Sequence, residues 1–493
     1  MHIGFDHDKY TAMQSEHILN RIAKFGGKLY LELGGKLFDD THASRVLPGF
    51  RPDSKISMLL NLKEQAELVI VINAEDIEKN KTRGDLGITY DAEVLRLIDA
   101  FRGIGMYVGS VVLTRWNDQR AAVLFKQRLE SLGIPVYRHY TIEGYPYNVK
   151  HIVSDDGFGM NEYVQTTRPL VLVTAPGPGS GKMAVCLSQL YQEHQRGVQA
   201  GYAKFETFPI WNLSLKHPVN VAYEAATVDL DDHNMIDPFH LEAYGETTVN
   251  YNRDIEIFPV LNAVFEQIYG SSPYASPTDM GVNMVGNCII DDDVCRSAAH
   301  QEIIRRYYAA RSALRKGQGT QAEVDKLEML LQKSGLSDAD RPVIAAARAR
   351  AEETGEPAAA MQLPDGTIVT GKTTKLLGPS AALLLNVLKA LGGIEKSAHL
   401  IAPHVIGPIQ SLKCDYLGNH NPRLHTDEVL LALSISAATD ERAAIAMKQL
   451  PLLKSCEAHS TVLLSPVDNN TFKRLGVNLT CDPQYQTHKL YHK

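Results

Sequence analysis

The chain has 493 residues, of which 44% are hydrophobic and 22% are charged, and its formal net charge is −7. This length predicts about three domains with large buried cores, and the composition is ordinary for a globular protein. Because basic residues are not in excess, the charge balance argues against a general nucleic-acid-binding protein.

The cysteines and the amino terminus indicate the cellular compartment. Six cysteines are scattered along the chain without a Cys-x-x-Cys pair, a pattern typical of free thiols in a reducing compartment. The first residues form no signal peptide, and no run of about 18 apolar residues could span a bilayer. We therefore expect a cytoplasmic protein with no membrane partner.

Apolar and amphipathic stretches alternate over residues 1–165, which we treat as a first region. The segment from Phe38 to Ser57 is polar and is expected to be a loop. Strands alternating with helices of this length indicate βαβ units. The fold class is therefore α/β, with a Rossmann-like or P-loop-like parallel sheet in the N-terminal part. The expected helices are 10–25, 89–101 and 118–132, and the expected strands are 28–33, 68–73, 107–114 and 134–140.

A glycine-rich turn opens a second α/β region, residues 166–290, which is either separate from the first or continuous with it. Leu170–Thr174 is an apolar, β-branched run that predicts a buried parallel strand, and a helical pattern begins at Met183. In this context a glycine turn can bind phosphate through its backbone N–H groups, the helix amino terminus and a lysine. The predicted phosphate-binding residues are Gly177, Gly179, Ser180, Gly181 and Lys182.

This turn differs from a standard phosphate-binding loop at two positions. Pro176 replaces the first glycine, and Met183 replaces the hydroxyl residue that normally ligates Mg²⁺. The pattern therefore favours an anion site, for a nucleotide or another phosphorylated small molecule, over a Mg²⁺-dependent ATPase. The alternative is a Gly/Pro-rich turn with a surface lysine.

Polar residues follow the other predicted strands, where parallel sheets bind ligands. Glu75 and Asp76 follow one strand, Arg115 follows the next, and His139 lies near the end of a third. Together they would form a cleft rim of mixed charge. The alternative for each residue is a role in capping the next helix.

Three further residues are candidates for catalysis, namely Lys204, Glu206 and Asp229. The segment Lys204-x-Glu206 resembles the second strand of the dethiobiotin-synthetase-like amidoligases, which carry a lysine close to the phosphates, although the usual proline after that lysine is missing here. Asp229 would take a part similar to that of a Walker B carboxylate. The nearby stretch Asp231–His240 contains carboxylates and imidazoles without a fixed metal-ligand spacing, so we assign no metal residue.

The rest of the chain divides into a helical subdomain, residues 291–356, and a C-terminal α/β domain, residues 357–493. Three amphipathic helices are expected in the subdomain, the second opened by the capping box Thr320-x-x-Glu323. Their mixed charges favour a solvated face or a contact between copies of the chain. In the C-terminal domain, we expect helices at 381–391, 426–437 and 441–450, and strands at 367–370, 399–405, 461–464 and 477–480.

The segment Gly366–Thr373 matches the Walker A pattern completely, but its context is wrong. Its four intervening residues are all β-branched and follow a tight turn, so we expect an extended segment that cannot gather N–H groups around one anion. Gly378-Pro379-Ser380, at a helix start, is the better anion candidate. The polar turn Asn419–Arg423 is a further candidate for a cleft.

Three segments together resemble a bacterial family of conserved proteins of unknown function. They are Thr174–Met183, Lys204–Trp211 and Asn234–Glu246, and the resemblance covers essentially the whole chain. Some members of that family are labelled ATP-dependent peptidases. The chain carries no zinc-protease or serine-nucleophile motif that would support this label.

Two classes of function stay open. The first is an enzyme that holds a phosphorylated small molecule at Gly177–Lys182 and uses Lys204, Glu206 or Asp229 in chemistry. The second is a non-catalytic binding or assembly protein that keeps a vestigial anion site.

Overall fold

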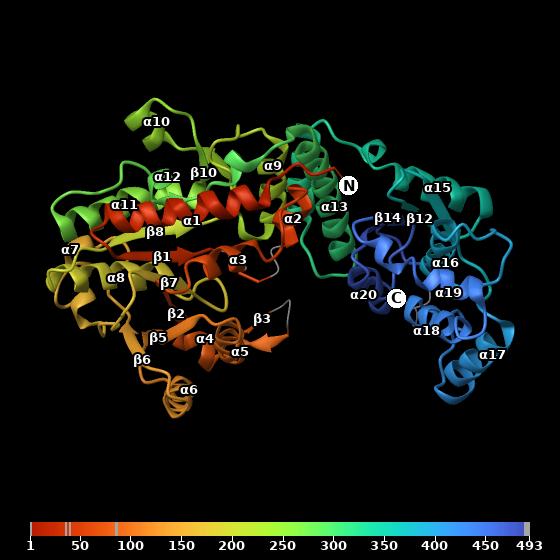
Figure 1. The fold of residues 1–493 in the computed structure, drawn as a ribbon, viewed down its shortest axis with the longest axis horizontal. Helices are drawn as coiled ribbons and strands as arrows, with labels where there is room; N and C mark the ends of the chain where they lie inside the picture. Colours follow the sequence, from red (N-terminus) through yellow and green to blue (C-terminus); the bar gives the residue numbers. More distant parts are fainter. Residues whose placement is uncertain (1, 35–36, 39–40, 84–86, 488–493) are drawn as a thin grey trace. The chain divides into compact units, whose positions relative to one another are not determined.

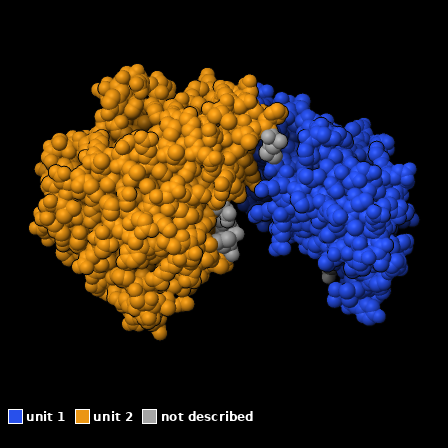
Figure 2. Space-filling model, in the orientation of Figure 1, with its two compact units in different colours: residues 1, 299–493 blue, residues 2–298 orange. Residues whose placement is uncertain are grey.

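A computed structural model describes residues 2–34, 37–38, 41–83 and 87–487, which form two compact units, residues 2–298 and 299–493. Figure 2 colours the two units separately. The boundary between them falls within helix α13 (Asp292–Arg315). Each unit has its own sheet and its own buried core.

Seven strands of the described residues form one parallel sheet in the first unit, in the order β11-β8-β1-β7-β2-β5-β6. Strands from both sides of residue 165 therefore share one sheet, and Figure 1 shows β8 to β6 following one another in this order. The seven strands are β1 (Leu29–Leu33), β2 (Ala66–Asn73), β5 (Tyr107–Trp116), β6 (Val136–Tyr140), β7 (Leu170–Thr174), β8 (Gly201–Phe205) and β11 (Gly281–Val282).

The first unit also contains two small two-stranded sheets and its helices. The short strands are β3 (Thr82–Arg83), β4 (Ile88–Thr89), β9 (Asn234–Ile236) and β10 (Val249–Tyr251). The helices are α1 (His7–Lys24), α2 (Thr41–Val46), α3 (Ser54–Asn61), α4 (Ala74–Glu78), α5 (Tyr90–Gly103), α6 (Arg120–Ser131), α7 (Val149–Ile152), α8 (Lys182–Gln195), α9 (Pro218–Ala226), α10 (Pro238–Tyr244), α11 (Asn252–Tyr269) and α12 (Pro277–Met280).

Helices cover both faces of the parallel sheet because alternate strand side chains point to opposite faces. In β2, Leu68 and Ile70 join the core formed with α1, α3, α5 and α6. Val69 and Val71 join the core formed with α8 and α11. All eight residues of β2 are buried, as expected for a strand covered on both sides.

The strand order places β7 at a topological switch point. From β1 the chain continues to β2 on one side, whereas from β7 it crosses β1 to reach β8 on the other side. In open α/β sheets, ligands bind beyond the carboxyl ends of the strands at such a point. The glycine-rich turn directly follows β7.

The second unit contains a four-stranded mixed sheet in the order β13-β12-β14-β15, in which only β14 and β15 pair in parallel. Helix α15 packs on one face, and α16, α18 and α19 contribute to the core on the other. Its strands are β12 (Ala358–Gln362), β13 (Ile368–Lys372), β14 (Glu457–Ser460) and β15 (Asn478–Cys481). Besides the carboxyl-terminal part of α13, its helices are α14 (Gln321–Lys333), α15 (Pro342–Thr354), α16 (Pro379–Leu391), α17 (Pro403–Ser411), α18 (Thr426–Ser436), α19 (Glu441–Met447) and α20 (Pro466–Arg474).

Most predicted elements are confirmed, and three predictions are wrong. The expected loop 38–57 contains α2 and α3, whose buried residues anchor them to the core, while Asp39 and Asp40 lie outside the described residues. The expected strand 399–405 is not extended, because α17 begins at Pro403. The expected strand 461–464 is displaced, because β14 ends at Ser460.

Candidate functional site

The glycine-rich turn needs its glycines for two different reasons. Gly179 and Gly181 have φ angles of 77° and 92°, in the left-handed region that other residues rarely adopt. Gly177 instead packs against Tyr90, where an added Cβ would lie 2.2 Å from the phenolic oxygen. Backbone conformation and close packing therefore fix the shape of this turn.

Several backbone N–H groups of the turn form no hydrogen bond within the part of the chain that the structure describes. Ser180 donates its hydroxyl to the carbonyl oxygen of Gly177 at 2.9 Å, and Thr114 donates to the carbonyl oxygen of Ser180 at 2.7 Å. The N–H groups of Gly177, Gly179, Ser180 and Gly181 have no acceptor among the described residues. The turn is thus held through its carbonyl groups, while its donors stay available.

Lys182 begins α8 directly after the turn, as predicted. Its Nζ lies 3.9 Å from Oε1 of Glu32, beyond ordinary hydrogen-bond distance. The side chains of Lys182 and Glu32 are 18% and 9% exposed. The amine is therefore near the turn without a tight bond to this carboxylate.

Glu32 connects the glycine turn to a buried group of charges on β8. Its Oε2 accepts a hydrogen bond from Tyr202 at 2.8 Å. Two residues further along β8, Lys204 Nζ contacts Glu206 Oε1 at 2.8 Å and both oxygens of Asp254 at 2.7 Å. Glu32 is also the register partner of Lys204 on the adjacent strand, so ionisable groups lie close to one another from the turn to α11.

The pKa values in this buried charge cluster follow from burial and pairing. Burial lowers the pKa of Lys204, but Asp254 and Glu206 outweigh it and raise this pKa well above its usual value. Burial raises the pKa of Glu206, with Lys204 acting in the opposite direction. Lys204 is thus held as a cation, whereas Glu206 is shifted toward its protonated form.

Lys204 and Glu206 also line a pocket of 420 Å³ in the first unit. Further lining residues come from α1, α10 and the segment around β11, including Arg21, His240 and Asn283. A pocket of this size is sufficient for a small organic molecule. The buried charge cluster therefore has one side facing a cavity.

The third catalytic candidate lies apart from this cluster. Asp229 is exposed in a short 3₁₀ turn after α9 and has no ion pair or hydrogen bond with Lys204 or Glu206. The structure instead brings Glu32, Tyr202 and Asp254 to the site, none of which we predicted. A charged residue within the apolar run Leu29–Leu33 was the available signal for Glu32.

The predicted rim residues have separate environments. Arg115 Nη1 lies 3.7 Å from Glu75 Oε2, and Asp76 pairs with Lys81 at 3.2 Å. His139 is buried, and burial lowers its pKa to about 4. Glu75 and Arg115 are thus the pair of predicted rim residues that contact each other.

The acidic and histidine-rich stretch after α9 supports local structure. Asp237 caps α10 through the N–H groups of Phe239 and His240, and Asp232 pairs with Arg253 at 2.6 Å. Within the described ranges, no three His, Cys, Asp or Glu side chains form a group able to hold a metal ion. The segment Ile368–Lys372 is extended in β13, which confirms the conformation that we expected for the Walker A match.

Comparison with known proteins identifies relatives over the whole chain. Residues 3–335 match the family described as Domain of unknown function DUF1846, N-terminal, and residues 339–491 match its C-terminal counterpart. A UPF0371 protein of Streptococcus pyogenes serotype M5 is 58% identical over 491 residues, covering 100% of this chain and 99% of the relative. A UPF0371 protein of Streptococcus equi subsp. equi is 58% identical over 489 residues, covering 99% of each chain. In the described part of the chain, no helix combines the length and apolar character needed to span a membrane.

Proposed function

Because the chain belongs to the DUF1846 family of unknown function, we propose its activity from geometry: the first unit binds a nucleotide or another phosphorylated small molecule at residues 177–182. The phosphate would accept hydrogen bonds from the turn and the first residues of α8, with Lys182 supplying positive charge. The six unpaired cysteines fit a reducing, cytoplasmic setting for this binding.

The unpaired N–H groups of the turn carry this proposal. Four N–H donors within five residues, interrupted by Pro178, have no acceptor among the described residues, and they lie at the carboxyl end of a central parallel strand, where such a turn can cradle an anion. Lys182 supports the same ligand, since its amine is only loosely associated with Glu32 at 3.9 Å. A bound phosphate would therefore take the place of Glu32 as the partner of this amine.

The hydroxyl chemistry of the turn favours binding without Mg²⁺. Ser180 is 1% exposed and donates to a carbonyl oxygen within the turn, and Met183 offers no hard oxygen ligand. Phosphoryl transfer is therefore not the expected reaction. If the unit is an enzyme, Glu206 is the group best suited to exchange a proton with the ligand, because burial raises its pKa.

The test is a thermal-shift and calorimetry panel of nucleotides and sugar phosphates, with and without Mg²⁺. We expect saturable binding by the wild type that is independent of Mg²⁺ and is weakened about tenfold or more in Lys182→Ala, since a charged hydrogen bond is lost. Lys216→Ala, which removes an exposed lysine elsewhere in this unit, should bind like the wild type. Absence of binding by the wild type, or equal binding by Lys182→Ala, would refute the proposal.

A non-catalytic binding protein is the second candidate. Lys204 has three carboxylate contacts within 2.8 Å from Asp254 and Glu206, so its pairing is already complete without a ligand. Such a cluster can serve as a rigid support for a binding site. Ligand binding without turnover, measured by following the bound compound over many hours, would favour this candidate over an enzyme.

A further inference from the structure

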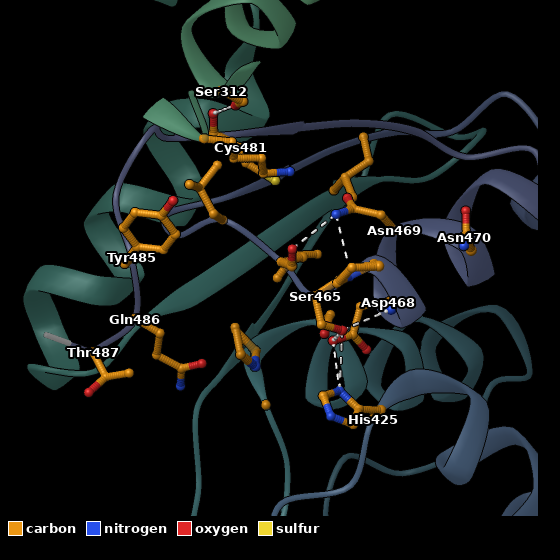
Figure 3. Close-up of a pocket in the computed structure, with 18 of the residues that line it drawn as sticks. Ser312, His425, Ser465, Asp468, Asn469, Asn470, Cys481, Tyr485, Gln486 and Thr487 are labelled. Atoms are coloured by element: carbon orange, nitrogen blue, oxygen red, sulfur yellow. Dashed lines mark hydrogen bonds and ion pairs between the residues drawn. The ribbon is translucent and has the colours of Figure 1, made fainter. Parts of the chain in front are cut away.

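The second unit contains a cavity of 1150 Å³ that is separate from the glycine turn (Figure 3). It is lined by the start of α16, by the segment Asn419–His425, by the start of α20 and by the chain that follows β15. Binding sites for small molecules span about 300–1,000 Å³, so this cavity has room for a metabolite. The two segments that we singled out at 378–380 and 419–423 both contribute to it.

A parallel bridge brings these two segments together. Leu377 pairs with Leu424, and the N–H of Leu424 donates to the carbonyl oxygen of Leu376 at 2.8 Å. Because the bridge is parallel, the chain continues on both sides in the same direction, toward Ser380 and His425. Both of these residues line the cavity.

Ser380 provides a buried hydroxyl donor at the cavity. It is 2% exposed, and its hydroxyl has no hydrogen bond among the described residues, although it borders the cavity. Ser380 is the second residue of α16, a helix of 13 residues, so the free N–H groups of the first helical turn are next to this hydroxyl. A helix amino terminus with a free hydroxyl favours an anionic group.

His425 is oriented by a buried carboxylate. Its Nδ1 lies 3.0 Å from Asp468 Oδ2, and Thr426 holds the other carboxylate oxygen through its N–H and its hydroxyl, both at 2.9 Å. Figure 3 shows this contact together with Ser465, which donates to Asp468 at 2.8 Å. The Nδ1 atom is thus the donor to Asp468, and Nε2 has no partner among the described residues.

Positive charge and amide groups complete the lining. Arg423 and Lys316 border the cavity, and the hydrogen bond to Asp468 raises the pKa of His425, which favours its cationic form. Asn419, Asn421 and Asn470 add amide groups, which can both donate to and accept from hydroxyl groups. The positive charge at the cavity favours binding of an anion, and the amide groups can form hydrogen bonds with a ligand that carries several hydroxyl groups.

We propose that this cavity binds a sugar phosphate. The phosphate lies at the amino terminus of α16, where it accepts a hydrogen bond from Ser380, and His425 contacts the ligand through Nε2. The asparagine amides bind the sugar hydroxyls. This site is independent of the glycine turn, which belongs to the other unit.

The test uses the full chain carrying Lys182→Ala, so that any phosphate site at the glycine turn is weakened. Ribose 5-phosphate, ribose and inorganic phosphate are titrated by calorimetry. We expect ribose 5-phosphate to bind at least about tenfold more tightly than either fragment, because both recognition elements are then engaged. No saturable binding of ribose 5-phosphate, or equal binding of a fragment, would overturn the proposal.

Two variants locate the ligand. Ser380→Ala removes the free hydroxyl, and His425→Asn keeps an N–H donor for Asp468 while it removes Nε2. Each should weaken ribose 5-phosphate binding about tenfold, which is the loss expected for a hydrogen bond to a charged group. His404→Asn, on the exposed side of α17, should have no effect. Unchanged affinity for ribose 5-phosphate in Ser380→Ala and in His425→Asn would refute this site.

Discussion

Lys204 Nζ lies 2.7 Å from each carboxylate oxygen of Asp254, and this contact joins strand β8 to helix α11. Both side chains are 15% exposed. Charges removed from water in this way are stabilised only while their partners stay in place. The contact therefore ties the conformation of the candidate site to the packing of α11 on the sheet.

Substitution of Lys204 by Met should strongly destabilise the first unit. It leaves Asp254 and Glu206 buried without their cation, so we expect the free energy of unfolding at pH 7 to fall by about 3–5 kcal/mol. Urea denaturation measures this change, and Lys216→Met serves as the exposed control. A loss below about 1 kcal/mol would mean that the buried pair contributes no more than a surface salt bridge.

Two glycines of the turn should differ in their tolerance of alanine. In Gly177→Ala the new Cβ would lie 2.2 Å from the phenolic oxygen of Tyr90, so the turn or the Tyr90 side chain must move, at a cost of about 1–3 kcal/mol. In Gly179→Ala the side chain meets open space, and only the positive φ costs energy, about 1–2 kcal/mol. Thermal denaturation should show the larger loss for Gly177→Ala, and the reverse order would contradict this packing.

Arg341 should be irreplaceable by lysine in the second unit. Its guanidinium is fully buried and contacts Glu457 Oε2, Gln301 Oε1 at 3.1 Å and the carbonyl oxygens of Ala458 and Asn478 at 3.0 and 2.8 Å. A single ammonium group cannot reach these acceptors together. We expect Arg341→Lys to lower the free energy of unfolding by about 3 kcal/mol. Chemical denaturation with Arg350→Lys as the surface control tests this, and equal losses in the two variants would contradict it.

The pair His425–Asp468 should make the stability of the second unit depend on pH. Asp468 raises the pKa of His425, so this contribution is fully present below the unfolded value and is lost as pH rises through the folded one. Burial raises the pKa of Asp468, but the hydrogen bonds from His425 and Thr426 outweigh burial and hold this pKa below its usual value. The contribution of Asp468 to stability is therefore lost as pH falls below about 4. The pair is therefore most stabilising between about pH 4 and pH 6.5.

Hydrogen exchange of residues 426–436 measures this local stability. The difference in protection between the wild type and His425→Asn should be largest near pH 5.5 and should shrink above pH 8. His404→Asn should follow the wild type at each pH. A difference that grows with rising pH would contradict the assigned sign.

The sequence predicted the parallel sheet well because long buried strands have an unmistakable local pattern. The runs at 68–73 and 170–174 are apolar up to their last residue, and they are confirmed as β2 and β7. The short helices α2 and α3 were missed because a few buried residues in a polar segment give little periodicity. The strand β12, with three alanines, was missed because alanine favours helices when it is considered alone.

By itself, the sequence determined the strand, the glycine turn and the helix at 170–195, because these depend on neighbouring residues. The tertiary structure alone decided that Glu32 and Asp254 join Lys182 and Lys204 in one site. These partners are distant in the sequence, and they meet because β1 lies between β7 and β8 and because α11 packs over β8. Ion pairing depends on distance and burial in three dimensions, which no local pattern of residues encodes.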